Sequence, residues 1–368
     1  MGKRRVLGPS AWMLGATGLL IGVVAAILVS QGNPGNMGLC LACFLRDIAS
    51  FFAGEAANMA GTAYLRPEIV GLMLGATVAS LGFREFRARG GSGALYRFAL
   101  GFVFMVSALI FLGCPVRAWL RLGGGDLNAA VGVAGLITGV LIGTWFLKRG
   151  YVVGRSRKLA TAVGWLMPAI AVVLLVLALV TSAAGSAPLG FTSAEAGSGV
   201  PGGVRAPLFL SLGAGLAIGF AAQRSRFCTV GGVRDAILVK RYDLLVGVAG
   251  LVLGVFVMNV ALGQFSLGFE GQPAAHTNFL GNYLPMVLVG LTAVLMGGCP
   301  LRQVVMASEG DLDATSSVAG MLVGAVVAHA ASIASTPAGP ASAAWLALGI
   351  MAVVTLGIGF LRTQKAAA

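Results

Sequence analysis

Ten apolar stretches account for most of this chain and constrain its fold more than any other feature. They run over about 11–31, 68–83, 95–113, 128–147, 161–184, 207–222, 244–263, 284–298, 316–335 and 342–361. A helix that crosses the hydrocarbon core of a bilayer needs about 17–25 apolar residues. The stretches at 68–83 and 284–298 are shorter than this. We therefore expect short half-helices to fill part of the membrane thickness.

The low charge content excludes most other fold classes. Of the 368 residues, 58% are hydrophobic and only 10% are charged, whereas a soluble domain is roughly one-quarter charged. So few charges cannot cover a surface exposed to water, which excludes a soluble enzyme, a nucleic-acid-binding domain and a disordered chain. The sequence predicts an all-α integral membrane protein.

The positive charge is distributed unevenly along this predicted topology. With the N-terminus in the cytoplasm, all but five of the 25 Lys and Arg residues fall on the cytoplasmic side; the five are Arg46, Arg66, Arg117, Arg121 and Arg205. Cytoplasmic loops of membrane proteins carry such an excess. We expect a multi-pass protein of the cell inner membrane with both termini in the cytoplasm.

An internal repeat is the most informative pattern. Cys40 precedes Arg46-Asp47 at the spacing at which Cys228 precedes Arg234-Asp235. Likewise, Gly113-Cys114-Pro115-x-Arg117 leads to Asp126 at the spacing at which Gly298-Cys299-Pro300-x-Arg302 leads to Asp311. We expect a first repeat over 1–184, an external Gly/Ser/Ala/Pro-rich linker over 185–206 and a second repeat over 207–368.

The number of stretches in each repeat sets its orientation. Five stretches per repeat would invert the second copy across the membrane, and inverted repeats are a recurrent transporter architecture with the substrate site between the halves. The alternative is a duplication kept for folding alone. The first stretch follows Lys3-Arg4-Arg5, as in a signal peptide, but Leu14-Gly15-Ala16 recurs as Leu212-Gly213-Ala214, so we expect a retained helix.

The Gly-Cys-Pro motifs predict helix starts. Proline suits the first helical position, so Cys114 and Cys299 would sit at helix N-termini, where the partial positive charge favours an anion and thiolate character. Arg117 and Arg302 add positive charge within one turn. Half-helices are tolerated in a membrane where they line a cavity or are buried in protein. The motifs therefore indicate a small anion site that contains sulfur; the alternative for each cysteine is simple packing.

Several other residues have two interpretations. Cys43 completes a Cys40-x-x-Cys43 pair, which suits a redox role, but the counterpart Cys228-x-x-Gly231 lacks the second cysteine, which favours packing or an auxiliary role. Arg46-Asp47 and Arg234-Asp235 either hold loops by ion pairing or attract the anion. Asp126 and Asp311 open helices as N-caps, which is compatible with tethering Arg117 and Arg302.

The remaining candidates point away from metal or proton-pump chemistry. His276 and His329 stand in no spacing typical of zinc ligands, although an ionisable residue within a span, such as His329, is a functional candidate beside its packing role. No Asp or Glu lies in the middle of a predicted stretch, and there is no P-loop. The glycine pairs Gly71/Gly75 and Gly250/Gly254 suit close helix packing. We expect no metal and no cofactor.

The chain resembles the YeeE/YedE family of sulfur-compound transporters over nearly its whole length, and within it the branch of YedE-type selenium transporters. The resemblance rests on the two Gly-Cys-Pro motifs and on Gly35-Asn36-Met37-Gly38, Ala42-Cys43-Phe44-x-Arg46-Asp47, Tyr64-x-Arg66-Pro67-Glu68-Ile69, Arg84-Glu85-Phe86-Arg87-Ala88-Arg89-Gly90-Gly91 and Gln223-Arg224-Ser225-Arg226-Phe227-Cys228.

The resemblance implies an hourglass with inward-pointing short helices, in which thiol S–H groups pass a thiosulfate-type anion along. Cys114 and Cys299 would then be central, with Cys40 and Cys228 nearer the two mouths. The branch differs from the thiosulfate group in the surrounding residues, so the resemblance implies a selenium species.

We therefore expect a transporter rather than an enzyme, which takes up a small sulfur- or selenium-containing anion along a path lined by Cys40, Cys114, Cys228 and Cys299 with Arg117 and Arg302. Two rivals remain. One is a membrane thiol enzyme that passes electrons, sulfur or selenium across the bilayer by thiol–disulfide exchange. The other is a subunit that recruits a cytoplasmic sulfur-carrier or selenium-metabolism protein without transporting anything. Besides the anion and the lipid bilayer, such a carrier protein is the partner we consider.

Overall fold

The computed structural model describes residues 10–363 and is an all-α integral membrane protein. Lys3, Arg4, Arg5, Lys365 and both predicted cytoplasmic termini lie outside the described residues. The strands in the described part are β1 (Arg89–Gly90) and β2 (Arg157–Lys158), which pair as a short antiparallel ribbon.

Every one of the ten predicted stretches contains a long helix. Within residues 10–363, nine helical segments are apolar and long enough to cross a membrane, and α3 adds a shorter apolar helix. The helices are α1 (Ala11–Ser30), α3 (Pro67–Gly82), α4 (Ala94–Phe111), α6 (Leu127–Lys148), α8 (Leu166–Ala184), α9 (Leu208–Ser225), α11 (Asp243–Ala261), α12 (Phe279–Met296), α14 (Leu312–Ala330) and α15 (Ser342–Leu361).

One of the two short stretches is longer than the sequence predicts. α3 has 16 residues, as expected, but α12 has 18 and begins at Phe279 rather than near 284. The side chain of Asn278 caps it by accepting the N–H of Gly281, and the helix continues through Pro285. Gly281 and Asn282 interrupt the apolar run after Phe279 and Leu280, so the apolar pattern alone did not predict this first turn.

Four short helices occupy the connections between the long ones. They are α2 (Leu41–Ala53), α5 (Pro115–Gly123), α10 (Thr229–Leu238) and α13 (Pro300–Ser308). The one-turn helix α7 (Thr161–Gly164) precedes α8, and three short 3-10 turns complete the helical structure: η1 (Gly54–Ala57), η2 (Ala60–Thr62) and η3 (Pro188–Gly190).

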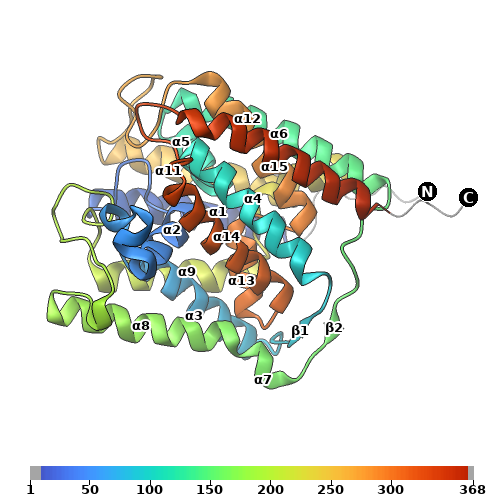
Figure 1. Cartoon of the computed structure of the whole chain (residues 1–368), viewed down its shortest axis with the longest axis horizontal. Helices are drawn as coiled ribbons and strands as arrows, with labels where there is room; N and C mark the ends of the chain where they lie inside the picture. Colours follow the sequence, from blue (N-terminus) through green and yellow to red (C-terminus); the bar gives the residue numbers. More distant parts are fainter. Residues whose placement is uncertain (1–9, 364–368) are drawn as a thin grey trace, which may run out of the picture.

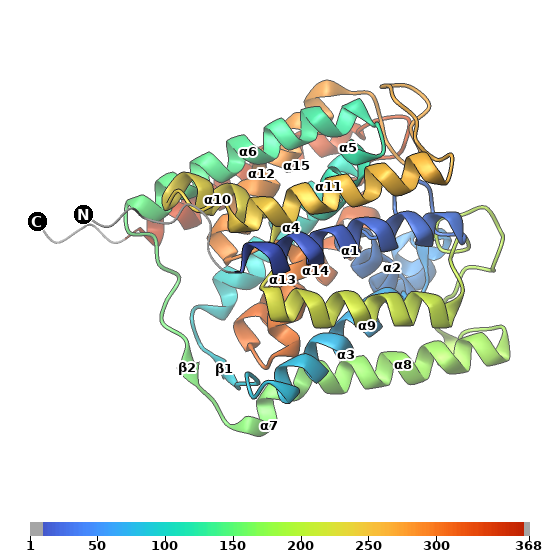
Figure 2. The same cartoon turned by 180° about the vertical axis from the view of Figure 1, so that it is seen from behind.

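The short helices lie toward opposite ends of the bundle. Figure 1 shows α2 and α5 toward the end that also holds the connection from α8 to α9, whereas α13 lies toward the end with β1, β2 and α7. The reverse view in Figure 2 places α10 toward that second end as well. Two pairs of short helices therefore enter the bundle from its two ends.

The long helices pack in pairs that correspond between the halves. α1 lies along α11 and α3 along α9, while α6 lies along α12 and α4 along α14. The repeat matches α1 with α9, α3 with α11, α4 with α12 and α6 with α14. Under this matching the pair α1–α11 corresponds to the pair α9–α3, and the pair α6–α12 corresponds to the pair α14–α4. The inversion of the halves across a membrane stays a prediction.

Glycines set the closeness of these helix pairs. A Cβ placed on Gly71 or Gly75 of α3 would lie 2.3 or 2.2 Å from a carbonyl oxygen of α9, and one on Gly250 or Gly254 of α11 would lie 2.4 or 2.6 Å from a carbonyl oxygen of α1. Small residues allow backbones to approach where lipid gives no hydrophobic drive for helix association. Both predicted glycine pairs are packing sites.

Substitution of Gly75 by alanine should therefore destabilise the protein. The added methyl group would overlap the carbonyl of Leu216 at 2.2 Å, and overpacking typically costs about 1–3 kcal/mol. Gly213→Ala, on the partner helix α9, is the control because nothing lies within 4 Å of its added Cβ; alanine should there stabilise the helix by up to about 1 kcal/mol. Thermal unfolding of both variants in detergent measures the difference, and equal midpoints would contradict close α3–α9 packing.

Candidate functional site

Each of the four motif cysteines is the N-cap residue of a short helix. Cys40 and Cys228 cap α2 and α10, and their sulfur atoms accept the N–H groups of Cys43 and Gly231. Cys114 and Cys299 precede α5 and α13, each of which has proline in its first turn. Because backbone N–H groups at a helix start lack intrahelical partners, each short helix places free N–H donors next to a buried thiol, and the four thiols form two separate clusters.

The first-half cluster consists of Cys40, Cys43, Cys114 and Arg117. Cys40 Sγ lies 2.8 Å from Cys43 Sγ and 4.0 Å from Cys114 Sγ, and Arg117 Nη1 lies 3.6 Å from Cys43 Sγ. All three cysteines are free thiols and buried. The fold therefore joins the Cys40-x-x-Cys43 pair to the first Gly-Cys-Pro motif in one site.

Arg117 carries a buried charge without an acidic partner. Its residue is 1% exposed. Nε donates to the carbonyl of Asn36 at 2.8 Å, Nη2 donates to the carbonyl of Ala274 at 3.0 Å, and Nη1 donates to the carbonyl of Leu112. Among residues 10–363, no carboxylate lies within 4.0 Å of this guanidinium. Neutral carbonyls satisfy its donors but leave its charge uncompensated.

The second-half cluster consists of Cys228, Cys299 and Arg302. Cys228 Sγ accepts the backbone N–H of Cys299 at 3.4 Å, and both thiols are buried. Arg302 Nη1 donates to Glu309 Oε1 at 3.2 Å. The two halves thus share the cysteine arrangement and differ in how the arginine charge is balanced.

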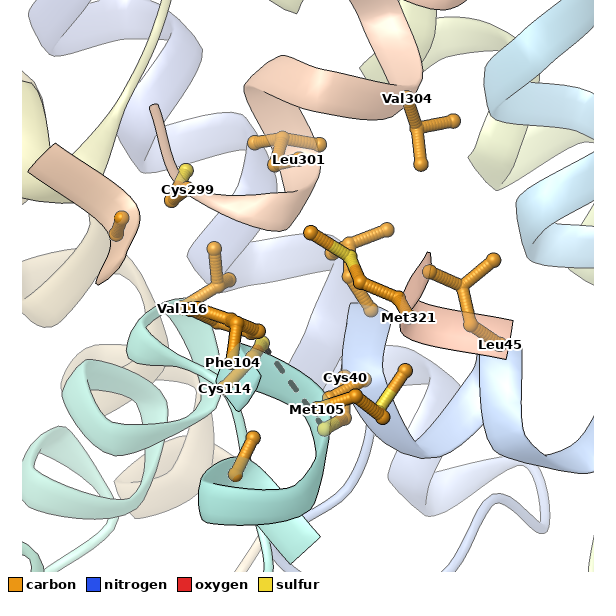
Figure 3. Close-up of a cluster of buried hydrophobic side chains, with 14 of the residues drawn as sticks. Cys40, Leu45, Phe104, Met105, Cys114, Val116, Cys299, Leu301, Val304 and Met321 are labelled. Carbon is orange, nitrogen blue, oxygen red and sulfur yellow. Dashed lines mark hydrogen bonds between the residues drawn. The ribbon is translucent and has the colours of Figure 1, made fainter. Parts of the chain in front are cut away.

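Apolar side chains surround the motif cysteines. Figure 3 draws Cys40 and Cys114, joined by the dashed contact, apart from Cys299; Val116 lies between Cys114 and Cys299 in this view, Leu301 lies beside Cys299, and Met321 lies above Cys40. Val116, Leu301 and Met321 are fully buried. The structure therefore shows the cysteines of the two halves apart, with packed apolar side chains around them.

A cavity of about 270 Å³ adjoins the first-half cluster. Its lining includes Gly38, two residues before Cys40, and Leu120, one helical turn after Arg117. Polar side chains also line it, from Asn36, Asn259, Gln264 and Gln272. The first-half cluster therefore lies beside a cavity that is partly polar, although its thiols are buried.

The two Arg-Asp motifs form ion pairs, as one of the two interpretations predicts. Arg46 Nε donates to Asp47 Oδ1 at 2.9 Å and Arg234 Nε donates to Asp235 Oδ1 at 2.8 Å. In the first half the pair is extended, because the fully buried Arg66 donates to Asp47 Oδ2 at 2.6 Å. The second pair is partly exposed, with each side chain 29% accessible.

Asp126 and Asp311 cap helices but do not tether the motif arginines. Asp126 accepts the N–H of Asn128 at the start of α6, and Asp311 accepts two N–H groups at the start of α14. Their ion-pair partners are Arg121 at 2.6 Å and Arg89 at 2.7 Å. The tethering of Arg117 and Arg302 is therefore wrong: one has no carboxylate partner and the other pairs with Glu309.

Three buried charged residues were not predicted as site residues: Glu68, Arg121 and Glu309. Glu68, at the start of α3, is buried and accepts hydrogen bonds from Asn33 Nδ2 at 2.9 Å and Ser211 Oγ at 3.0 Å. Arg121 is fully buried, and Glu309 is nearly so. The repeat could have revealed Glu309, because Glu309 occupies the position at which the first half has Gly124.

The histidines lie apart from the clusters. His276 Nε2 lies 3.1 Å from the carbonyl oxygen of Ile110, and His329 Nε2 is buried without a hydrogen-bond partner. In the described part of the chain, no group of three or more His, Cys, Asp or Glu residues is arranged to hold a metal ion. Neither histidine contributes to the thiol sites.

The chain is similar to sulfur-compound transporters. Residues 224–364, from the end of α9 to just beyond α15, match the sequence profile of the family described as Sulphur transport. A segment of 100 residues is 35% identical to the thiosulfate transporter TsuA of Escherichia coli (strain K12), and this match covers 26% of the chain and 27% of that relative. Both similarities point to a transporter rather than an enzyme.

Removal of the Asp47 carboxylate should destabilise the protein strongly. Asp47→Ala leaves Arg66 buried and without its ion-pair partner, and breaking a buried pair from one side costs about 3–5 kcal/mol. Asp235→Ala, at the equivalent position, removes a partly exposed pair, which contributes about 0–1 kcal/mol. Unfolding in detergent with increasing denaturant compares the two, and similar losses would contradict the structural role of Asp47.

Proposed function

We propose that this protein takes up a small sulfur- or selenium-containing anion across the cell inner membrane, along a path that passes Cys40, Cys114, Cys228 and Cys299. The observation that carries this proposal is Arg117, a buried guanidinium without a carboxylate beside three thiols. A buried charge is costly unless it is paired. A bound anion would supply the missing partner.

The surrounding groups suit such an anion. The N-termini of α2 and α5 add partial positive charge near Arg117, and their cap residues, Cys40 and Cys114, present sulfur. A thiol is a weak hydrogen-bond donor and is polarizable. It can therefore contact a sulfur or selenium atom of the anion without holding it tightly. A path for conduction needs sites that bind well enough for entry and weakly enough for release.

The substrate class follows from the two kinds of group. Arg117 suits the charged oxygen atoms of an oxyanion, and the thiols suit its sulfur or selenium end. The name of the relative indicates thiosulfate for that protein, while the motif resemblance favours a selenium species. Thiosulfate, selenite and selenosulfate are the candidates.

Transport requires the packed state in Figure 3 to open. Val116 and Leu301 lie on α5 and α13, each two residues after its cysteine cap, and Met321 projects from α14. Small displacements of these two short helices would separate the apolar side chains and connect the two thiol clusters. In this proposal Cys114 and Cys299 exchange the anion between the halves.

We infer an inverted five-plus-five topology with both termini in the cytoplasm. The end of the bundle with β1, β2 and α7 (Figure 1) also holds the C-terminal ends of α3, α6, α9 and α15, each followed within two residues by Arg or Lys. The positive-inside rule assigns such an end to the cytoplasm. By this assignment the first-half cluster faces the outside and the second-half cluster faces the cytoplasm.

Reporter fusions should test this topology. Alkaline phosphatase is active only outside the cytoplasm, whereas a fluorescent protein such as GFP is fluorescent inside it. Near Ser198, in the connection from α8 to α9, the phosphatase fusion should be active. At the C-terminus the fluorescent fusion should be active, because an odd number of crossings separates the two sites. Two reporters on the same side would contradict the inversion.

Purified protein in proteoliposomes should take up at least one labelled anion among thiosulfate, selenite and selenosulfate. Cys114→Ser and Cys299→Ser should each reduce the uptake rate by tenfold or more, because serine keeps a small donor but removes the polarizable sulfur. Cys43→Ser should have a smaller effect, because Gly231 takes its place in the second half.

Gel filtration of each cysteine variant serves as the control for folding. Unchanged uptake by both the Cys114 and Cys299 variants would contradict the thiol path. The rival thiol enzyme is distinguished in the same vesicles by alkylation and intact mass: a transporter keeps five free thiols during uptake, whereas thiol exchange requires a disulfide or persulfide at some stage.

A further inference from the structure

The two Gly-Cys-Pro helices differ at one charged position. α5 and α13 each contain nine residues, begin with proline and carry arginine at the third position. Their C-cap residues are Gly124 and Glu309, each seven residues after the motif arginine. The same position therefore supplies a carboxylate to Arg302 and nothing to Arg117.

The geometry around Glu309 makes this carboxylate specific for Arg302. Glu309 is 8% exposed, and its Oε1 atom lies 3.2 Å from Arg302 Nη1. Its second oxygen lies 3.9 Å from Arg89, which has a closer partner in Asp311 at 2.7 Å. Removal of the Glu309 charge would therefore leave Arg89 paired and expose the charge of Arg302.

We propose that Glu309 is a positioning residue that makes the second-half cluster bind the transported anion more weakly than the first-half cluster does. This inference rests on the proposed function. An anion at the first-half cluster meets the uncompensated charge of Arg117. At the second-half cluster the anion would have to share Arg302 with a carboxylate, and like charges in a poorly solvated site repel strongly.

If the second-half cluster binds the anion more weakly than the first-half cluster, the anion is released more readily at the second-half end of the path. Each cluster brings two motif cysteines together, and Cys43 adds a third thiol in the first half. The charge next to the motif arginine is a second difference between the two ends. The carboxylate of Glu309 lowers the positive potential at one of them. The half-saturation concentration should therefore be higher from the face of the second-half cluster than from the face of the first.

Two substitutions move this charge in opposite directions. Glu309→Gln keeps the shape and removes the charge. Gly124→Glu installs a carboxylate seven residues after Arg117, where the added Cβ would meet the side-chain ends of Asn259 and Asn36 at 3.1 and 3.3 Å and the carbonyl oxygen of Arg121 at 3.3 Å. Gly124→Gln adds similar bulk without charge, and Glu309→Asp retains the charge; these are the matched controls.

Labelled thiosulfate, selenite and selenosulfate fluxes into and out of proteoliposomes of uniform orientation give the half-saturation concentration at each face, and the best-transported anion is used for the variants. Glu309→Gln should lower the half-saturation concentration about tenfold at the second-half face, with little change at the other face. A tenfold change corresponds to a difference of about 1.4 kcal/mol in binding free energy. Glu309→Asp should restore the wild-type value. Gly124→Glu should raise the half-saturation concentration about tenfold at the first-half face, and Gly124→Gln should leave it near that of the wild type.

The outcomes separate this inference from the proposed function. If the wild-type protein transports none of the three anions, both are overturned. If it transports one and Glu309→Gln changes neither face, or both faces equally, the role of Glu309 is overturned and transport stands. If Glu309→Gln does not fold, Gly124→Glu decides: a shift no larger than that of Gly124→Gln overturns the inference.

Discussion

Short helices that begin inside a membrane protein leave backbone N–H groups without partners, and this constraint organises the molecule. Water is scarce in such a setting, so every buried donor needs another acceptor. The sulfur atoms of Cys40 and Cys228 accept some of these N–H groups at 3.3 Å, but sulfur is a weak acceptor. The positive ends of the four short helices therefore lie next to thiols instead of carboxylates, which fits the transient anion of the proposed function.

The two halves differ within the two cysteine clusters. Both halves keep the cysteine caps, the prolines and the motif arginines. In the first half Cys43 adds a third thiol and Arg117 lacks a carboxylate, whereas the second half has Gly231 and Glu309 at the matching positions. A strictly symmetric molecule would present the same potential at both ends. The positions at which the two halves differ therefore determine how the potential differs between the two ends.

Local patterns predicted the helices and their caps, and long-range contacts limited the prediction of the site. Apolar runs located all ten long helices, and Gly-Cys-Pro located the starts of α5 and α13. The partners of Arg117 lie on the segment before α2 and on the loop before α12, far apart in sequence. The motif spacing suggested Asp126 as the partner of Arg117, but Asp126 caps the next helix and pairs with Arg121 instead.

The choice of cysteine as cap residue supports a functional role for sulfur. Serine, threonine, aspartate and asparagine are the favoured N-caps and stabilise a helix by about 0.5–2 kcal/mol over alanine. The same chain uses Asp126, Asn278 and Asp311 for this purpose at α6, α12 and α14. At the four short helices it uses cysteine instead. If stability alone determined these positions, oxygen would serve better: sulfur caps α2 and α10 only weakly, and the side chains of Cys114 and Cys299 make no cap hydrogen bond. Cysteine at all four positions therefore fits the proposed contact between sulfur and the anion better than a capping role.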